Sequence, residues 1–285
     1  MSIRIRRARP SDKRAIMEFV KDIWRGHDYI PYVWDEWMDD RGGRMFVAEI
    51  EGRAVAMNRI RFLEDGSGWL EGVRVHPRHR RKGLATLLGK NSVRFGRSRG
   101  VGTFKLTSAS TNKAAHGSVV KMGFAELARM NIYSPSKGKR FRPSRGVRQA
   151  KADELAQVWG RVKNSEEYSL GGGVYWDGFT AISLTPETLA KRVRGGSVYL
   201  VGDGIAIAQR GGEGTEAWRQ VCFATGPEKD VAKLVKYVFG RKERFRTTRR
   251  VAYAPPRSPL VKSLSRVGLA RGHTFLLFQF ESAKS

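Results

Sequence analysis

A short basic segment, Arg80-Arg-Lys-Gly83-Leu-Ala85, stands where an apolar stretch gives way to the apolar spacing of a helix. Backbone N–H groups of a tight glycine-containing turn, together with the positive end of a helix, attract phosphate groups, and small residues let the anion approach closely. The pattern therefore predicts a pyrophosphate site, with a plain helix start and incidental basic residues as the alternative. The residues of the predicted site are Arg80, Arg81, Lys82, Gly83, Leu84 and Ala85.

Such a site needs a strand before the turn and a helix after it. Residues 68–75 have the composition of a strand, and residues 83–95 form a helix built on regularly spaced leucines. The other elements predicted in this half are strands at 3–6, 45–49, 54–61, 104–107 and 127–133, and helices from 13 onward and at 113–122.

A second pattern lies further along, in Asn112-Lys-Ala-Ala115-His-Gly-Ser-Val119-Val-Lys-Met-Gly123-Phe124. Together the two segments closely resemble the acetyl-CoA-binding signatures of the GNAT superfamily of N-acetyltransferases. In that family a strand ends in Val-x-Pro and is followed by Arg-x-x-Gly-x-Gly/Ala, and Asn-x-x-Ala precedes Gly-Phe. This chain has Val75-His-Pro77 before its basic segment, and the order of its elements from residue 3 to residue 133 also resembles the family.

The resemblance implies that acetyl-CoA binds in a cleft between two parallel strands that separate. Its pyrophosphate would lie on the turn from Arg80 to Ala85, and its pantetheine would pair with the strand at Val73, Arg74 and Val75. Asn112, in the second signature, is assigned to coenzyme binding with them. The implied reaction is direct attack of an unprotonated amine on the thioester carbonyl.

An amine is mostly protonated at neutral pH, so a base or a water chain must take a proton before or during the attack. Glu71 is our candidate base, because strand alternation puts it on one face with Val73 and Val75, and similar proteins often carry an acid there. Glu49 is the second candidate. For either carboxylate, a surface or ion-pairing role is the alternative.

The departing thiolate has no obvious proton donor. The family often has a tyrosine seven residues after the asparagine, placed to protonate this sulfur, but this chain has Val119 there. Because the coenzyme thiolate is a tolerable leaving group even without a proton, we expect slower chemistry or a substitute donor, His116 or Ser118. For His116, a position on the helix surface is the alternative.

Aromatic residues follow the first predicted helix, in the segment that commonly borders the acceptor pocket in this family. Tyr29, Trp34 and Trp37 either stack on an acceptor ring or build the core. His27-Asp-Tyr-Ile-Pro and Trp69-Leu-Glu-Gly-Val also resemble the histidine N-acetyltransferase-like subgroup of the superfamily. This shorter resemblance implies a free amino acid as acceptor, within the broader class of small-molecule amines.

The second half of the chain repeats the first in outline. Val198-Tyr-Leu-Val-Gly-Asp-Gly204 echoes Phe46-Val-Ala-Glu-Ile-Glu-Gly52 and is again followed by an apolar strand. We therefore predict an α/β fold with a mixed α+β sheet, made of two tandem GNAT-like domains. The expected division is a catalytic domain at 1–135, a basic linker at 136–146 and a degenerate domain at 147–285.

The second copy lacks the phosphate-binding pattern. Where the first half has its basic segment, the second has Ala224-Thr-Gly-Pro-Glu228-Lys-Asp230. Those two acids would cap a helix but repel a pyrophosphate, so we expect a single coenzyme site. Elsewhere in this half, Gly171-Gly-Gly-Val-Tyr175-Trp176 predicts a flexible aromatic loop, either a lid or a plain surface loop.

The charge of the chain is strongly positive, since 54 Lys and Arg against 27 Asp and Glu give +27. Such a surface attracts polyanions and predicts an acidic or nucleic-acid partner, with solubility as the alternative cause. Two further functions stay open on this ground and on the missing tyrosine. One is a GNAT-fold protein without useful catalysis that binds RNA or the ribosome, and the other is an acetyltransferase for protein N-termini or lysines.

Composition disfavours several other classes. The single cysteine, Cys222, excludes an internal disulfide and a cysteine-based zinc finger, and no metal site is predicted. No segment has the length and apolarity of a signal core or a membrane span, so we expect a cytoplasmic protein without a membrane partner. The sequence leaves the oligomeric state open.

Overall fold

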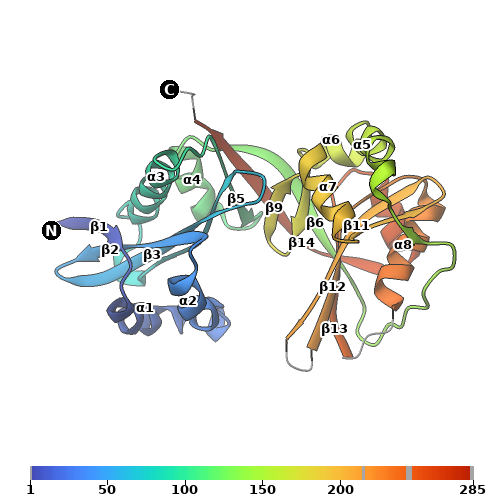
Figure 1. The fold of residues 1–285 in the computed structure, drawn as a ribbon. Helices are drawn as coiled ribbons and strands as arrows, with labels where there is room; N and C mark the ends of the chain where they lie inside the picture. Colours follow the sequence, from blue (N-terminus) through green and yellow to red (C-terminus); the bar gives the residue numbers. More distant parts are fainter. Residues whose placement is uncertain (1, 214–215, 242–245, 283–285) are drawn as a thin grey trace. The chain divides into compact units, whose positions relative to one another are not determined.

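The computed structural model describes residues 2–213, 216–241 and 246–282, which fall into two compact units (Figure 1). The segments of unit 1 are Met1–Leu106, Asn112–Glu126 and Phe278–Ser285, and those of unit 2 are Thr107–Thr111 and Leu127–Leu277. Each unit thus takes residues from more than one stretch of the chain. The boundary between the two units does not fall in the predicted linker 136–146, because this segment lies wholly within unit 2.

Unit 1 is a sheet with helices on both faces. Its strands follow the order β1-β2-β3-β4-β5, with the end of β14 beyond β5, and only β4 and β5 run parallel among the first five. In Figure 1, α1 and α2 lie below this sheet, and α3 and α4 lie above it. The elements are β1 Ile3–Arg7, α1 Lys13–Val20, α2 Ile30–Asp39, β2 Gly43–Ile50, β3 Arg53–Phe62, β4 Gly68–Val75, α3 Leu84–Arg97, β5 Thr103–Ala109 and α4 Lys113–Lys121.

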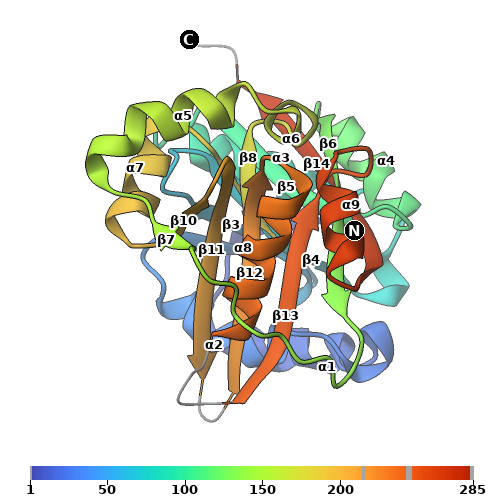
Figure 2. The same cartoon turned by 90° about the vertical axis from the view of Figure 1, so that its right-hand side faces the viewer.

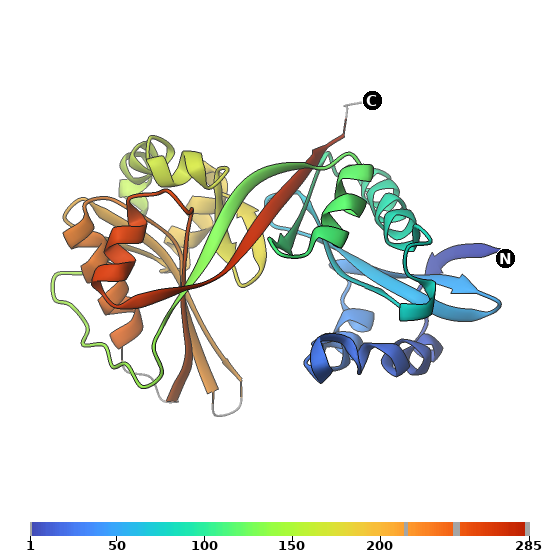
Figure 3. The ribbon, with the colours of Figure 1, turned by 180° about the vertical axis from the view of Figure 1, so that it is seen from behind.

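Unit 2 repeats this arrangement, which confirms the predicted mixed α/β fold. Its strands follow the order β14-β6-β13-β12-β11-β10-β7, and β12 and β13 are parallel as β4 and β5 are. Figure 2 shows α8 lying along β11 and β12 with α9 nearby, and Figure 3 shows β6 and β14 side by side. The elements are β6 Ala125–Pro135, β7 Arg148–Gln149, α5 Leu155–Lys163, α6 Glu166–Leu170, β8 Val174–Asp177, β9 Thr180–Ser183, α7 Pro186–Arg194, β10 Val198–Val201, β11 Gly204–Glu213, β12 Glu216–Thr225, α8 Glu228–Gly240, β13 Arg246–Ala254, α9 Leu260–Arg266 and β14 Leu269–Glu281.

The glycine-rich aromatic segment of unit 2 is a buried hairpin, so the prediction of a flexible loop is wrong. Val174–Asp177 forms β8 and pairs with β9 in a separate small sheet. Tyr175 and Trp176 are almost fully buried, and the Trp176 ring stacks on Tyr253 with centroids 5.8 Å apart. The glycines mark the turn into this hairpin, and the aromatic rings fill the core.

The helices α1 and α2 form because each carries one apolar stripe with the period of a helix. Both stripes pack against strands β2 and β3 and make one cluster. Its most deeply buried members are Ile16, Phe19, Val20, Ile30, Trp34, Met45, Val47, Ala54 and Met57. Within the part of the chain that the structure describes, no helix has the length and apolarity needed to cross a membrane.

Strand β4 carries a β-bulge at Gly72, which changes which residues share a face. In the register with β3, Glu71 lies opposite Arg59, and Arg74 lies opposite Met57. A step of two residues on β3 therefore matches a step of three on β4. Because residues two apart on β3 share a face, Glu71 and Arg74 share one as well.

The bulge requires glycine for two reasons. Gly72 has a φ of +68°, which residues with a side chain rarely adopt, and a Cβ there would lie 2.6 Å from Cζ3 of Trp37. The prediction that Glu71, Val73 and Val75 share one face is wrong, because the extra residue of the bulge reverses the alternation.

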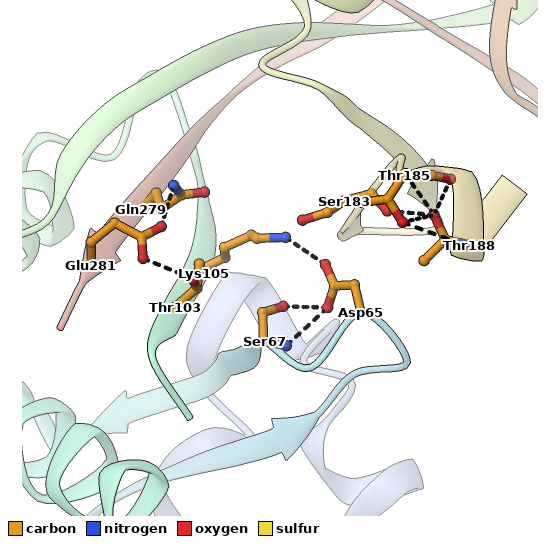
Figure 4. A network of polar contacts seen from close by, with 9 residues as sticks. All are labelled: Asp65, Ser67, Thr103, Lys105, Ser183, Thr185, Thr188, Gln279 and Glu281. Carbon is orange, nitrogen blue, oxygen red and sulfur yellow. Dashed lines mark hydrogen bonds and ion pairs between the residues drawn. The ribbon is translucent and has the colours of Figure 1, made fainter. Parts of the chain in front are cut away.

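The parallel strands β4 and β5 pair at two positions only, the second being Trp69 with Lys105. Near this point Lys105 Nζ makes an ion pair with Asp65 Oδ2 at 2.7 Å, and both side chains are 1% exposed. Asp65 also accepts hydrogen bonds from the backbone N–H and hydroxyl of Ser67 (Figure 4). Beyond Trp69, β4 continues to Val75 without this pairing, so the two strands separate.

We expect Gly72→Ala to destabilise unit 1 by about 2–4 kcal/mol, the sum of left-handed backbone strain and overpacking against Trp37. Gly66→Ala is the matched control, because Gly66 has a φ of +79° but a methyl group there would meet no atom within 4 Å. The free energy of unfolding of Gly66→Ala should fall by only about 1 kcal/mol, from backbone strain alone. Urea denaturation followed by tryptophan fluorescence measures both, and equal losses would contradict the packing argument.

Candidate active site

The turn between β4 and α3 has the backbone of an anion-binding loop. After a short 3₁₀ turn at Pro77–His79, Arg81 has a φ of +61° and Gly83 a φ of +75°. The first helical hydrogen bond runs from Leu87 N–H to the Gly83 carbonyl at 3.0 Å, and no side chain caps the helix. The N–H groups of the first turn of α3 therefore have no acceptor within the helix.

The space over this turn suits a pyrophosphate. A Cβ built on Gly83 would meet no atom within 4 Å, so the turn is open above the glycine. Arg80, Arg81 and Lys82 are all exposed beside it, and Arg80 Nε donates to the Val75 carbonyl at 3.4 Å, close to the end of β4. Open backbone N–H groups, the helix dipole and three cations thus converge on one place.

The predicted coenzyme-binding residues on β4 differ in what their side chains do. Val73, in the bulge, is 40% exposed. Arg74 is buried, pairs with Asp28 through Nε at 2.6 Å, and lies over the Tyr29 ring at 5.1 Å. The Arg74 side chain thus holds β4 to the segment before α2, and only its backbone is available to a ligand along the strand.

Glu71 lies in a cluster of charges on the α2 side of the sheet. Its Oε1 accepts a hydrogen bond from Arg59 Nη1 at 2.7 Å and lies 3.5 Å from Arg61 Nε. Arg59 also pairs with Asp40 and stacks over the Trp37 ring at 4.7 Å. Burial raises the pKa of Glu71, against the opposing effect of the two arginines.

These residues border a cavity of about 490 Å³ within unit 1. Trp37, Asp40, Arg59, Arg61 and Glu71 line it, so the cavity presents both signs of charge beside an aromatic ring. The sequence-based prediction did not include Arg59, Arg61 or Asp40 among the site residues. The alternation in the strand around Arg59 and Arg61 places both on one face, but only the register identifies Glu71 as their neighbour.

The other predicted acceptor residues have different surroundings. Trp34 is 1% exposed and belongs to the core of α1 and α2, which is the alternative that the sequence left open. Tyr29 is 38% exposed, and its ring meets that of Trp37 edge to face at 5.9 Å. Glu49, the second candidate base, is held in an ion pair with Arg6, at 2.6 Å.

The second signature forms the start of α4. Asn112 caps this helix by accepting a hydrogen bond from the Ala115 N–H at 3.3 Å. The His116 ring lies 5.4 Å from the Phe278 ring, at the end of β14. Val119 is 5% exposed, so the position where the family often has its tyrosine is part of the core and holds no hydroxyl group.

Unit 2 has its own carboxylates at the equivalent helix start. Asp230, in the first turn of α8, is buried and accepts a hydrogen bond from the Asp203 N–H at 3.3 Å. A Cβ on Gly226, in the turn before α8, would lie 2.5 Å from the Asp203 carbonyl oxygen, so this turn lacks the open space found over Gly83. Among the described residues, no group of three or more His, Cys, Asp or Glu is arranged to hold a metal ion.

Comparison with known proteins agrees with this geometry. Residues 13–124 match the sequence profile of the Acetyltransferase (GNAT) family. The solved structure of a GCN5-related N-acetyltransferase from Sphaerobacter thermophilus is similar over 98% of this chain and 95% of its own, with a TM-score of 0.62 and 15% identity. The solved structure of a GCN5-related N-acetyltransferase from Kribbella flavida is similar over 98% of this chain and 72% of its own, with a TM-score of 0.52 and 18% identity.

Curated relatives match over a shorter stretch. A histidine N-acetyltransferase from Oreochromis niloticus is 34% identical over 82 residues, and one from Scomber australasicus is 32% identical over 82 residues. Each match spans 28% of this chain and 24% of the relative. Residues 13–124 therefore match the GNAT acetyltransferase family, and the fold of solved GNAT proteins extends over nearly the whole chain.

We expect Gly83→Ala to weaken acetyl-CoA binding about ten-fold or more, because the methyl group takes space over the turn and strains its left-handed backbone. Isothermal titration calorimetry measures this, with one coenzyme bound per wild-type chain. Gly52→Ala is the control, since Gly52 has a φ of +77°, an equally open surrounding and a place in the β2–β3 hairpin. Equal affinities for Gly83→Ala and wild type would rule out the turn as the phosphate site.

Proposed function

We propose that unit 1 is an N-acetyltransferase that moves the acetyl group of acetyl-CoA to a primary amine of a small molecule or amino acid. The observation that carries this proposal is the open turn between β4 and α3, with its left-handed Arg81 and Gly83. The separation of β4 from β5 supports it, since it frees one side of β4 for an extended ligand. A second unit without such a turn supports one coenzyme site per chain.

The reaction assigned to this site is a direct transfer. The amine nitrogen attacks the thioester carbonyl carbon, a C–N bond forms, the C–S bond breaks, and sulfur leaves with the electron pair. The proton lost by the amine goes to the Glu71 carboxylate or to water beside it. A carboxyl whose pKa is raised by burial is better matched to this task near neutral pH than an exposed one.

The leaving sulfur departs as a thiolate or takes a proton from His116 or Ser118. Val119 supplies none, because its side chain is a buried hydrocarbon. Because a thiolate leaves more easily than an alkoxide or an amide anion, a missing donor slows the step without blocking it.

The cavity beside Glu71 favours an acceptor that carries both charges. Arg61, with its side chain 35% exposed, suits a carboxylate, and the acids Glu71 and Asp40 suit an ammonium group. A free amino acid has both groups. The histidine N-acetyltransferases among the relatives support this acceptor class, although this chain spans about a quarter of their length.

Glu71→Gln should lower turnover by about 10²–10⁴-fold on the best acceptor, because the amide cannot take the proton. A coenzyme-release assay with free amino acids, small amines and peptides as acceptors measures this. Glu49→Gln is the matched control and should retain its rate, and His116→Gln tests the proton donor in the same assay. Normal turnover by Glu71→Gln, or a loss in Glu49→Gln alone, would reassign the base.

The pH profile of kcat/KM gives an independent test. Activity falls as pH drops through the pKa of Glu71, because the protonated carboxyl is no base. Arg61→Gln removes the largest charge that lowers this pKa, so the acid limb moves to higher pH. Lys21→Gln, which removes an exposed cation elsewhere in unit 1, should leave the limb in place. An unmoved limb in Arg61→Gln would show that Glu71 does not set it.

A further inference from the structure

The basic linker, residues 136–146 between β6 and β7, packs against the helices of unit 2. Figure 2 shows it crossing over the lower part of α8. The Phe141 ring packs edge to face on Phe239 of α8, with centroids 5.3 Å apart. A Cβ on Gly240 would lie 2.6 Å from the Pro143 nitrogen, so the close approach of segment and helix depends on that glycine. On the other side, Lys139 lies directly against Gly268, after α9.

This packing gathers positive charge into one groove of about 520 Å³. Five of its described lining residues are cations, and none is a carboxylate. Two further exposed lysines lie on α8 at helical spacing from Lys236, on the same stripe. We call this set the basic face, and its members are Lys139, Arg140, Arg142, Lys229, Lys233, Lys236 and Arg266.

The acids near the basic face neutralise only part of its charge. Glu228 pairs with Arg266 at 3.0 Å, and the buried Asp230 lies 3.6 Å from Lys233. Seven cations against these two acids leave about five net positive charges on one side of unit 2. Like charges held together repel one another, so a bound polyanion stabilises a surface of this kind. Binding also releases the counterions that surround the polyanion, which favours the complex.

The chemistry around the groove favours phosphates over other anionic partners. Among the large apolar side chains described as exposed, none belongs to segment 136–146, to α8 or to α9. A membrane surface or an acidic protein is normally also held by apolar contacts, from inserted side chains or from an interface core. A nucleic-acid backbone is held mainly by cations.

We propose that the basic face binds the phosphate backbone of a nucleic acid, without reading its base sequence. The cations come from a segment fixed by Phe141 and Gly240 and from two helices of one unit, so the groove is formed before the ligand arrives. This binding does not depend on the proposed acetyl transfer, since every residue it uses lies in unit 2.

The test is fluorescence anisotropy with a labelled 20-nucleotide RNA, and with DNA of the same sequence, from 50 to 200 mM KCl. Wild type should bind with a steep salt dependence. The triple variant Arg140→Gln, Arg142→Gln, Lys236→Gln should lose about ten-fold or more in affinity at 100 mM salt and about 2–3 in the slope of log K against log salt. All three side chains are exposed, and circular dichroism checks that the variant is folded.

The matched control removes three exposed cations from unit 1 through Arg4→Gln, Lys21→Gln and Arg94→Gln. It has the same net charge as the first triple variant and should keep most of the affinity and the slope. Equal losses in the two variants would overturn the proposal, because net charge alone would then explain binding. Absence of RNA and DNA binding at 50 mM salt would overturn it too, as would a preference for phosphatidylserine vesicles over both nucleic acids.

Discussion

The early end of pairing between β4 and β5 is the constraint on which the proposed chemistry of unit 1 depends. A strand inside a sheet that loses one neighbour leaves backbone N–H and C=O groups on that side, and these groups need partners. The bulge at Gly72 adds a twist to the same strand, and the turn at Arg81 and Gly83 follows directly after it. One strand therefore carries the unpaired backbone groups, leads into the open turn at Gly83 and determines where Glu71 lies.

Charge is distributed differently in the two units. On the α2 side of unit 1, each arginine of the site has a carboxylate close by, as Arg74 has Asp28 and Arg59 has Glu71 and Asp40. Buried charges need such partners, because desolvation without compensation is costly. The exposed cations of the basic face are solvated and can remain in excess. The same basic composition thus yields an internally balanced pocket in one unit and an unbalanced surface in the other.

The sequence predicted what depends on neighbours along the chain and missed what depends on distant contacts. The turn around Gly83, the helix that follows it and the helix after Asn112 are local patterns, and the structure has each of them. The bulge at Gly72 appears only in the pairing of β4 with β3, and the ring of Trp37, 35 residues earlier, leaves room there for glycine alone. Strict alternation, which ignores the bulge, therefore grouped Glu71 wrongly with Val73 and Val75. The interleaving of the two units leaves no local mark at all, because a strand has the same pattern whichever sheet it joins.

That interleaving bears on how the protein is made. Thr103 of β5 bonds to Glu281, 178 residues later, so the outer edge of β5 receives its partner only after nearly all of unit 2 has been synthesised. Until then this edge of β5 lacks its neighbouring strand, and exposed edges invite pairing with other chains. Unit 1, which contains the first strand of the chain, is therefore completed only by the end of β14, and a chain cut short within β14 would leave both units incomplete.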